Sequence, residues 1–222
     1  MEQIKVGPLT LNYRPETTDR WVIEDTLKHS TYFKRLPMNQ DDVVLDLGMH
    51  IGTFSVYACR VAGLVIGVEP NIENYRIAEM NLEENHLNNN FLYRSAVVGD
   101  DRETAQFFLN RKRGKDGHSL IEKRGRERVE VPCVNISALI EKHKPTKIKM
   151  DIEGAEVEVL RSADLSGVEG IVIEYHRIFL GDKENRYYNE IQDRLVDQFD
   201  WMRATRPNGF HSMIYAGNGK IL

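Results

Sequence analysis

The segment DVVLDLGMHIGTFSVYACRVA, residues 42–62, decides the fold of this chain. Its first part, Asp42 to Gly48, is a short apolar run typical of a strand buried on both faces of a parallel sheet. Its second part, residues 52–62, has apolar residues at helical spacing. A buried strand, a glycine-containing turn and a helix predict a β-α-β unit with a ligand-binding loop where the strand ends.

Strand and helix patterns alternate along most of the remaining sequence. Pro70 ends a second buried strand, and Asn71 is a suitable N-cap for the helix behind it. This order predicts an α/β fold with a Rossmann-like, doubly wound and mostly parallel sheet, which binds its ligand at the carboxyl ends of the strands. The expected strands after residue 62 are 64–70, 91–98, 146–153 and 170–176, and the expected helices are 72–86, 137–143, 155–163 and 184–199.

Two regions depart from this alternation. Residues 104–110 and 129–136 predict the strands of an inserted β-hairpin, joined by the polar loop 111–128. Residues 201–206 and 211–217 predict a C-terminal antiparallel strand pair, which is common at the edge of a parallel sheet.

The length of 222 residues fits one large domain, and no linker or repeat divides the chain. Residues 1–40 are expected to be an N-terminal extension, helical within residues 19–36, that belongs to the same unit as the domain at residues 41–222.

Composition excludes several classes of protein. The 30 Lys and Arg against 34 Asp and Glu give a net charge of −4, which argues against broad wrapping around nucleic acid. The longest apolar runs, such as Leu64 to Val68, are far shorter than the ~20 residues of a membrane span, and the first residues lack the pattern of a secretory signal. Cys59 and Cys133 lie in apolar sequence, so we expect reduced core thiols in a cytoplasmic protein.

The loop after the first strand reads Asp46-Leu-Gly-Met-His-Ile-Gly. A dinucleotide-binding loop has the pattern G-x-G-x-x-G, whose second glycine lets the pyrophosphate approach the backbone. His50 stands at that position and Thr53 at the last one. The loop therefore suits a ligand without phosphate groups better than NAD.

Glu69 ends the second strand, 17 residues after Gly52. A carboxylate there can accept hydrogen bonds from both hydroxyls of a ribose. A ribose held by Glu69, with an amino-acid end on the loop from Gly48 to Gly52, describes S-adenosylmethionine. We expect this cofactor, with His50 and Thr53 also contributing to its binding loop.

Four motifs stand at the ends of expected strands: DLGMHIGTFS (46–55), VEPN (68–71), SAV (95–97) and KMDIEGAE (149–156). Together they resemble the FkbM-type branch of the class I S-adenosylmethionine-dependent methyltransferases, over about residues 41–176, and the last motif is the most specific. The resemblance implies O-methylation of a hydroxyl group on a sugar, polyketide or similar small molecule. It places Asp151 and Glu153 at the reaction centre and Ser95 and Ala96 near the adenine. The residues that it implies for cofactor binding are Asp46, Gly48, Gly52, Glu69 and Asn71.

Two buried strands end in polar residues, which indicates a site. Strand periodicity puts Asp151 and Glu153 on one face, and Glu174 and His176 likewise on one face. We expect Asp151 to orient the acceptor or the sulfonium group, Glu153 to cap the next helix, and Glu174 to contact the acceptor. His176 is the expected general base, because an imidazole titrates near ~6.5 and a carboxylate near ~4. A raised carboxylate pKa would reverse that choice.

A divalent metal is an alternative at the same place. Asp151, Glu174 and His176 would supply the oxygen and imidazole ligands that suit Mg²⁺ or Mn²⁺, as in catechol-type O-methyltransferases. Undiminished turnover in excess EDTA would exclude it.

Residues 111–128 carry eight Lys and Arg and three Asp and Glu, a charge of +5, whereas the rest of the chain carries −9. As a functional element this loop would recruit an anionic acceptor, such as a uronic acid, a phosphorylated glycan or an RNA end. Otherwise it is a solvated hairpin. His118 and Ser119 lie within it, and we expect them to reach the acceptor.

Three functions remain open from the sequence, and a small-molecule, sugar or glycan O-methyltransferase leads. An RNA ribose 2′-O-methyltransferase would use the same fold and the basic loop, but the Lys-Asp-Lys-Glu set typical of ribose methylation is not evident, so nucleic acid is not the expected partner. A non-catalytic S-adenosylmethionine-binding domain is the third, although the Asp46 loop, Glu69 and Asp151 are intact. The sequence does not indicate the oligomeric state.

Overall fold

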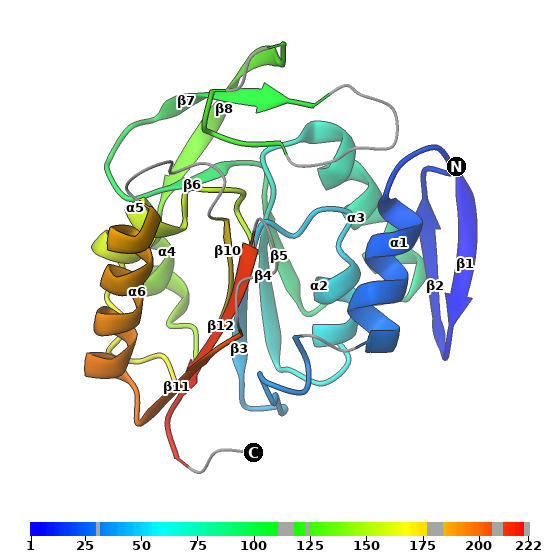
Figure 1. Cartoon of the computed structure of the whole chain (residues 1–222). Helices are drawn as coiled ribbons and strands as arrows, with labels where there is room; N and C mark the ends of the chain where they lie inside the picture. Colours follow the sequence, from blue (N-terminus) through cyan, green and yellow to red (C-terminus); the bar gives the residue numbers. More distant parts are fainter. Residues whose placement is uncertain (30–31, 111–117, 123–124, 177–183, 206–210, 220–222) are drawn as a thin grey trace.

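The computed structural model describes residues 1–29, 32–110, 118–122, 125–176, 184–205 and 211–219, and its main feature is a seven-stranded sheet (Figure 1). The strands are β3 (Val43–Leu47), β4 (Leu64–Val68), β5 (Asn90–Tyr93), β9 (Lys147–Met150), β10 (Gly170–His176), β11 (Trp201–Ala204) and β12 (His211–Gly217). Their order is β11-β12-β10-β9-β3-β4-β5. Strands β3, β4, β5, β9 and β10 run parallel, while β12 is antiparallel to β10 and β11 is antiparallel to β12. The expected mostly parallel sheet and its C-terminal antiparallel pair are confirmed.

The central strands are apolar on both faces because each face packs into a separate core. Val44 lies in one core and its neighbour Leu45 in the other, and both are fully buried. Burying such a side chain completely contributes roughly 1.5–3 kcal/mol to folding. The continuous apolar run that predicted this strand therefore has its cause in the two-sided packing.

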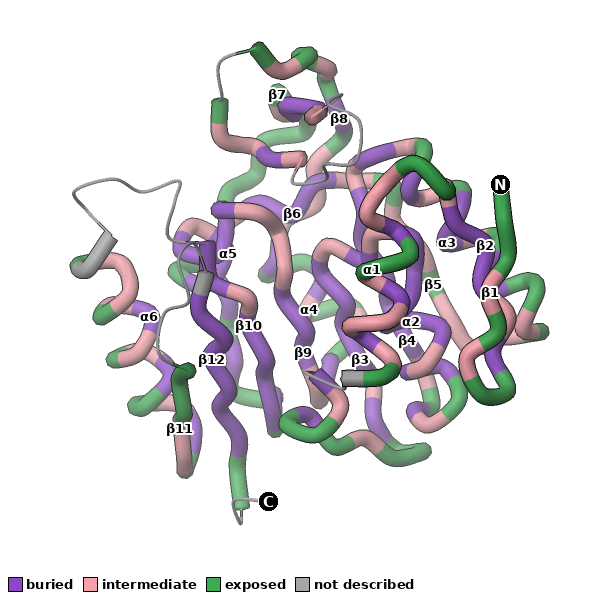
Figure 2. Tube along the Cα trace, turned by 45° about the vertical axis from the view of Figure 1, so that its right-hand side comes forward, coloured by how far each residue is buried: buried purple, intermediate pink, exposed green. Residues whose placement is uncertain are grey.

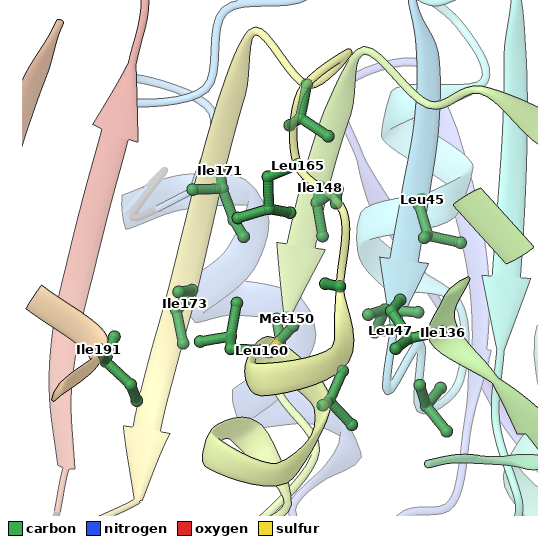
Figure 3. Close-up of a cluster of buried hydrophobic side chains, with 14 of the residues drawn as sticks. Leu45, Leu47, Ile136, Ile148, Met150, Leu160, Leu165, Ile171, Ile173 and Ile191 are labelled. Carbon is green, nitrogen blue, oxygen red and sulfur yellow. The ribbon is translucent and has the colours of Figure 1, made fainter. Parts of the chain in front are cut away.

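Helices cover both faces of the sheet, which gives three layers (Figure 1). The helices α4, α5 and α6 pack on the Leu45 face, where Ile136, Leu160 and Ile191 meet the strands (Figure 3). The helices α1, α2 and α3 and the π-helical turn η1 pack on the other face. Within the described ranges, none of the helices combines the length and the apolar character that crossing a membrane requires. The bounds are α1 (Asp19–Glu24), η1 (Asp25–His29), α2 (Thr53–Ala58), α3 (Ile72–Glu84), α4 (Ile136–His143), α5 (Glu156–Ser162) and α6 (Glu184–Gln198).

The N-terminal region contains strands that the sequence pattern did not predict. Strands β1 (Glu2–Val6) and β2 (Leu9–Tyr13) form an antiparallel hairpin before α1. The backbone N–H of Asn12 donates to Oδ1 of Asn81 in α3, at 2.6 Å. Leu11 is fully buried in the core on that side of the sheet. The hairpin is thus held by side chains that lie far away in the sequence.

A second, smaller sheet, in the order β6-β8-β7, lies above the main one in the view of Figure 2. Strands β7 (Thr104–Leu109) and β8 (Glu127–Asn135) form the expected inserted hairpin, and β6 (Ala96–Val98) pairs with β8 in parallel. The expectation of one strand over residues 91–98 is wrong: the chain leaves the main sheet after Tyr93 and enters the small sheet at Ala96. Tyr93 and Val97 both pack on the core formed with α4, α5 and α6, so periodicity alone cannot show the break between them.

Candidate active site

A cleft opens where β3, β4 and β9 end, with about 790 Å³ of space including its open mouth. The carboxyl ends of parallel strands meet at this edge, which is where α/β sheets bind ligands. The small sheet contributes Phe107 of β7 and lies above the main sheet in the view of Figure 1. The cleft is lined by Val22, Gly48, His50, Val68, Glu69, Pro70, Asn74, Ser95, Ala96, Val97, Phe107, His118, Leu120, Asp151, Ile152, Glu153 and Ala155.

Glycine is required at position 48 of the loop after β3. Gly48 has φ of 77°, and a Cβ there would lie 1.8 Å from the carbonyl oxygen of Asp151. Gly52 has φ of 78°, and a Cβ there would lie 2.9 Å from Cβ of Ala78 in α3. Both glycines thus allow backbones to approach closely, and only Gly48 lies on the cleft wall.

His50 forms the part of the wall that faces the N-terminal region. Its Nε2 lies 3.6 Å from Oδ1 of Asp19, a carboxylate that is fully buried. Arg14 donates to both oxygens of Asp19 at 2.8 Å and to Oδ1 of Asn74 at 2.7 Å. Since Asn74 and Val22 also line the cleft, residues 14–22 support one side of the site.

Glu69 presents a buried carboxylate to the cleft. Its Oε2 accepts the backbone N–H of His50 at 3.0 Å, and its Oε1 accepts that of Asn71 at 2.8 Å. Burial raises the pKa of Glu69, while His50, these two N–H groups and Lys149 oppose the rise. Each oxygen is oriented by one backbone donor and retains a lone pair for a ligand hydroxyl.

The residues expected to bind a cofactor fall into two groups. Gly48, His50, Glu69, Ser95 and Ala96 line the cleft, whereas Asp46, Gly52, Thr53 and Asn71 lie outside its wall. In the second group, Asp46 and Asn71 hold the elements that carry the site.

Asp46 shows how this support works. It is fully buried, accepts a hydrogen bond from the Ser55 hydroxyl at 2.6 Å, and pairs with Nζ of Lys149 at 3.2 Å. Lys149 also donates to the carbonyl oxygen of Gly48 at 2.7 Å. Asn71 caps α3 by accepting the N–H of Glu73 at 2.9 Å. These contacts hold the loop after β3 and the helix after β4 in place.

Asp151, Glu153 and His176 converge at the far end of the cleft. Nε2 of His176 lies 3.8 Å from Oδ1 of Asp151 and 3.7 Å from Oε2 of Glu153. One ligand atom from each of the three lies within 4.8 Å of the others. Asp151 and Glu153 line the cleft, while His176 is buried behind them.

The surroundings determine which of these groups can take a proton. Burial raises the pKa of Glu153 to about 7; His176 opposes the rise, and Asp151 adds to it. Burial lowers the pKa of His176, but Glu156, Glu153 and Asp151 outweigh it and hold that pKa well above its ordinary value. The expectation of His176 as the base relied on an ordinary imidazole, and these carboxylates remove that basis. Glu153 both lines the cleft and can accept a proton at neutral pH.

Glu156 completes this group, although we did not single it out from the sequence. It is fully buried, and its Oε1 lies 2.9 Å from Nδ1 of His176 and accepts the N–H of Gly154 at 3.0 Å. The signal was present, because Glu156 is the last residue of the KMDIEGAE motif.

Glu174 lies elsewhere than expected. The hydroxyl of Tyr32 donates to Oε2 of Glu174 at 2.8 Å, and Glu174 does not line the cleft. Tyr32 belongs to the N-terminal region, and no local pattern links it to residue 174. Strand periodicity placed Glu174 and His176 on the same face. It does not give the direction in which each side chain points at the end of a strand.

His118 and Ser119 have different places. His118 lines the cleft, and its Nδ1 accepts the N–H of Asn110 at 2.9 Å. Ser119 is fully buried and donates to the carbonyl oxygen of Glu153 at 2.6 Å. Because Glu153 has φ of 55°, a conformation that is uncommon without glycine, Ser119 stabilises the backbone that presents the carboxylate.

Much of the expected basic loop, residues 111–117 and 123–124, lies outside the described residues. In the described remainder, Arg128 pairs with Glu122 at 2.9 Å. Arg126 is half-buried and interacts with Glu153, and burial lowers its pKa. Its Nη1 is buried without a hydrogen-bond partner among the described residues.

Comparison with known proteins gives a family match. A family model described as the methyltransferase FkbM domain matches residues 46–205. No curated protein sequence matches the chain.

Several solved structures share the fold at low identity. An FkbM methyltransferase from Methylobacillus flagellatus KT has a TM-score of 0.51 and 15% identity, over 82% of this chain and 44% of that chain. Precorrin-6y C5,15-methyltransferase from Geobacter metallireducens GS-15 has a TM-score of 0.51 and 13% identity, over 94% of this chain and 93% of that chain. M. jannaschii TYW2 in complex with AdoMet has a TM-score of 0.51 and 13% identity, over 97% of this chain and 84% of that chain. These likenesses confirm the Rossmann-like fold.

Proposed function

Since the chain belongs to the FkbM methyltransferase family, we propose that it transfers the methyl group of S-adenosylmethionine to a hydroxyl group of a sugar, glycan or other small molecule. One observation carries the proposal: a single cleft has the Glu69 carboxylate in its wall and, in the same wall, Asp151 and Glu153. Glu69 can accept hydrogen bonds from a ribose, and Asp151 and Glu153 can bind an acceptor hydroxyl that must lose its proton.

The cleft fits the donor in three places. The oriented oxygens of Glu69 would accept the two ribose hydroxyls. Ala96, Val97 and Phe107 offer apolar contact for the adenine. The loop of Gly48 and His50 would face the amino-acid end of the donor. The TYW2 structure, which has the same fold, contains AdoMet.

The donor supplies an electrophilic methyl group: the acceptor oxygen forms a bond to the methyl carbon, and the carbon–sulfur bond breaks with its electron pair left on sulfur. What the protein adds is alignment and removal of the hydroxyl proton. Asp151 orients the hydroxyl. In the absence of a cation, Glu153 takes the proton, with His176 behind it as a positively charged neighbour.

The acceptor that we propose carries a negative charge. Arg126 stands near Glu153 and has a buried Nη1 without a hydrogen-bond partner in the described part of the chain. Arg126 does not itself line the cleft, so an acceptor carboxylate or phosphate beside Glu153 would pair with this donor after a movement of the Arg126 side chain. A cytoplasmic location is part of the proposal, and the free thiols of Cys59 and Cys133 are typical of a reducing compartment.

Calorimetry with S-adenosylhomocysteine tests the donor site. The wild-type protein should bind it and Glu69→Ala should not, while circular dichroism shows that the variant is folded. A labelled-methyl screen over uronic acids, neutral deoxysugars, polyketides and RNA then tests the acceptor. Incorporation into uronic acids that Arg126→Ala reduces supports the proposal. Incorporation of the labelled methyl group into RNA alone refutes the proposal. Absence of S-adenosylhomocysteine binding by the wild-type protein also refutes it.

A further inference from the structure

The group of Asp151, Glu153 and His176 has the arrangement of a cation site. We propose that these three side chains bind one divalent cation, Mg²⁺ or Mn²⁺, and that this cation ionises the acceptor hydroxyl. The proposal rests on the proposed function for the role of the cation, but not for its binding. It differs from the set expected from the sequence, because Glu153 takes the place of Glu174.

The distances within the group are close to those between ligands of one cation. Nε2 of His176 lies 3.8 Å from Asp151 and 3.7 Å from Glu153, too far for hydrogen bonds. Octahedral ligands about 2.1 Å from a cation lie roughly 3 Å apart when adjacent and roughly 4.2 Å apart when opposite. All three ligand atoms lie within 4.8 Å of one another. A cation can therefore contact all three after small side-chain movements.

Glu156 orients the imidazole for this role. Its Oε1 lies 2.9 Å from Nδ1 of His176, which keeps the Nδ1 proton toward Glu156. A cation would displace the second proton, on Nε2, and bind the Nε2 lone pair on the side of Asp151 and Glu153. A ligating histidine commonly donates its other N–H to a carboxylate in this way. The second oxygen of Glu156 is buried and has no hydrogen-bond partner among the described residues. Removing a carboxylate so completely from water is costly unless positive charge is nearby.

The neighbouring lysine does not neutralise the group. Nζ of Lys149 is 3.9 Å from Asp151 but 3.2 Å from Asp46, and it donates to the carbonyl of Gly48. Lys149 therefore belongs mainly to the support beneath the loop. Arg126 interacts with Glu153, but the three carboxylates of Asp151, Glu153 and Glu156 surround one imidazole, and this favours an added cation.

The proposed cation site opens onto the cleft where the acceptor would bind. Asp151 and Glu153 line the cleft, so a cation held by them would leave coordination positions open to the acceptor. A coordinated hydroxyl has a lowered pKa, and its proton goes to solvent. The oxygen then uses its freed electron pair for the new bond to the methyl carbon, as the carbon–sulfur bond breaks. Two carboxylates and one imidazole suit Mn²⁺ or Mg²⁺, because the soft thiolates preferred by other metals are missing from the group.

Titration of the purified full chain with Mn²⁺, followed by electron paramagnetic resonance, tests the site directly. Saturation at one ion per chain is expected. Asp151→Asn, Glu153→Gln and His176→Gln should each weaken Mn²⁺ binding at least about tenfold, and Glu156→Gln about 10–100-fold through the imidazole. Glu174→Gln is the matched control, since Tyr32 holds Glu174 outside the group, and its Mn²⁺ affinity should stay within twofold.

The outcomes separate this proposal from the proposed function. Absence of saturable Mn²⁺ binding overturns the cation site even if S-adenosylhomocysteine binds normally. A loss of Mn²⁺ binding in Glu174→Gln also overturns it, in favour of the set expected from the sequence. Undiminished turnover in excess EDTA overturns the role of the cation. Mn²⁺ binding with the variant pattern above supports the site even if no acceptor is found.

Discussion

Gly48 and Asp151 meet so closely that a Cβ on residue 48 would lie 1.8 Å from the carbonyl oxygen of Asp151. The strands that lead to them, β3 and β9, are neighbours in the sheet, and Lys149 of β9 donates to the carbonyl of Gly48. The donor loop and the residue that we place at the acceptor are thus joined through the backbone. A substitution in the loop after β3 is therefore expected to move the backbone at Asp151, and the reverse.

Gly48→Ala tests this contact. The added Cβ meets a backbone atom, and residue 48 has positive φ, so we expect a loss of about 2–4 kcal/mol in the free energy of unfolding, measured in urea. Gly167→Ala is the control, because nothing lies within 4 Å of a Cβ there, and it should change stability by under ~0.5 kcal/mol. Equal stability of the two variants would contradict the structure.

Glu69 should make donor binding depend on pH. Its pKa is raised above the ordinary 4.5 by burial, and only the ionised carboxylate has lone pairs for both ribose hydroxyls. The affinity for S-adenosylhomocysteine is therefore expected to be full at neutral pH and to fall as the pH drops through the raised pKa. Calorimetry between about pH 5 and 8 measures it.

Glu69→Gln is the control for this dependence. Its amide would set a donor against the N–H of His50 or Asn71, so affinity should fall roughly tenfold to a hundredfold at neutral pH. The remaining affinity should vary little with pH. If it keeps the wild-type pH profile, then a group other than Glu69 titrates instead.

Lys149→Met should destabilise the protein strongly. It would leave the fully buried carboxylate of Asp46 without its cation, which costs about 3–5 kcal/mol. Adding Asp46→Asn should recover a large part of this loss, because the unpaired charge is then gone. Lys28→Met, which breaks an exposed pair with Glu24, should cost under ~1 kcal/mol in the same urea unfolding assay. Additive losses in the double variant would show that Asp46 and Lys149 do not interact.

Asp19→Asn tests the wall built by the N-terminal region. Asp19 lies 3.6 Å from His50 and is held by Arg14, so the variant should loosen the loop that faces the amino-acid end of S-adenosylhomocysteine. We expect the affinity for S-adenosylhomocysteine to fall about tenfold. Adenosine, which lacks that end, should bind within about twofold of wild type. Glu24→Gln, on the same helix, is the control. An equal loss for adenosine would place the effect at the ribose instead.

The family and most of the sheet could be predicted because their determinants are local. The run from Val43 to Leu47 is apolar on both faces, and Gly48 follows it directly. The motifs that resembled FkbM methyltransferases lie within the matched residues 46–205, and the family is confirmed. The β1–β2 hairpin was missed because its partner, Asn81, lies far along the chain.

The sequence by itself determined the alternation of strands and helices, the glycine-containing turn after the first strand and the presence of acidic residues at strand ends, since each depends on neighbours a few residues away. Only the tertiary structure decided that Asp46 supports the loop from beneath, that Tyr32 holds Glu174, and that Glu156 meets His176. These contacts join residues on different elements, and their energies depend on burial and distance, which exist only once the sheet has formed. The same burial raises the pKa of Glu153 to about 7.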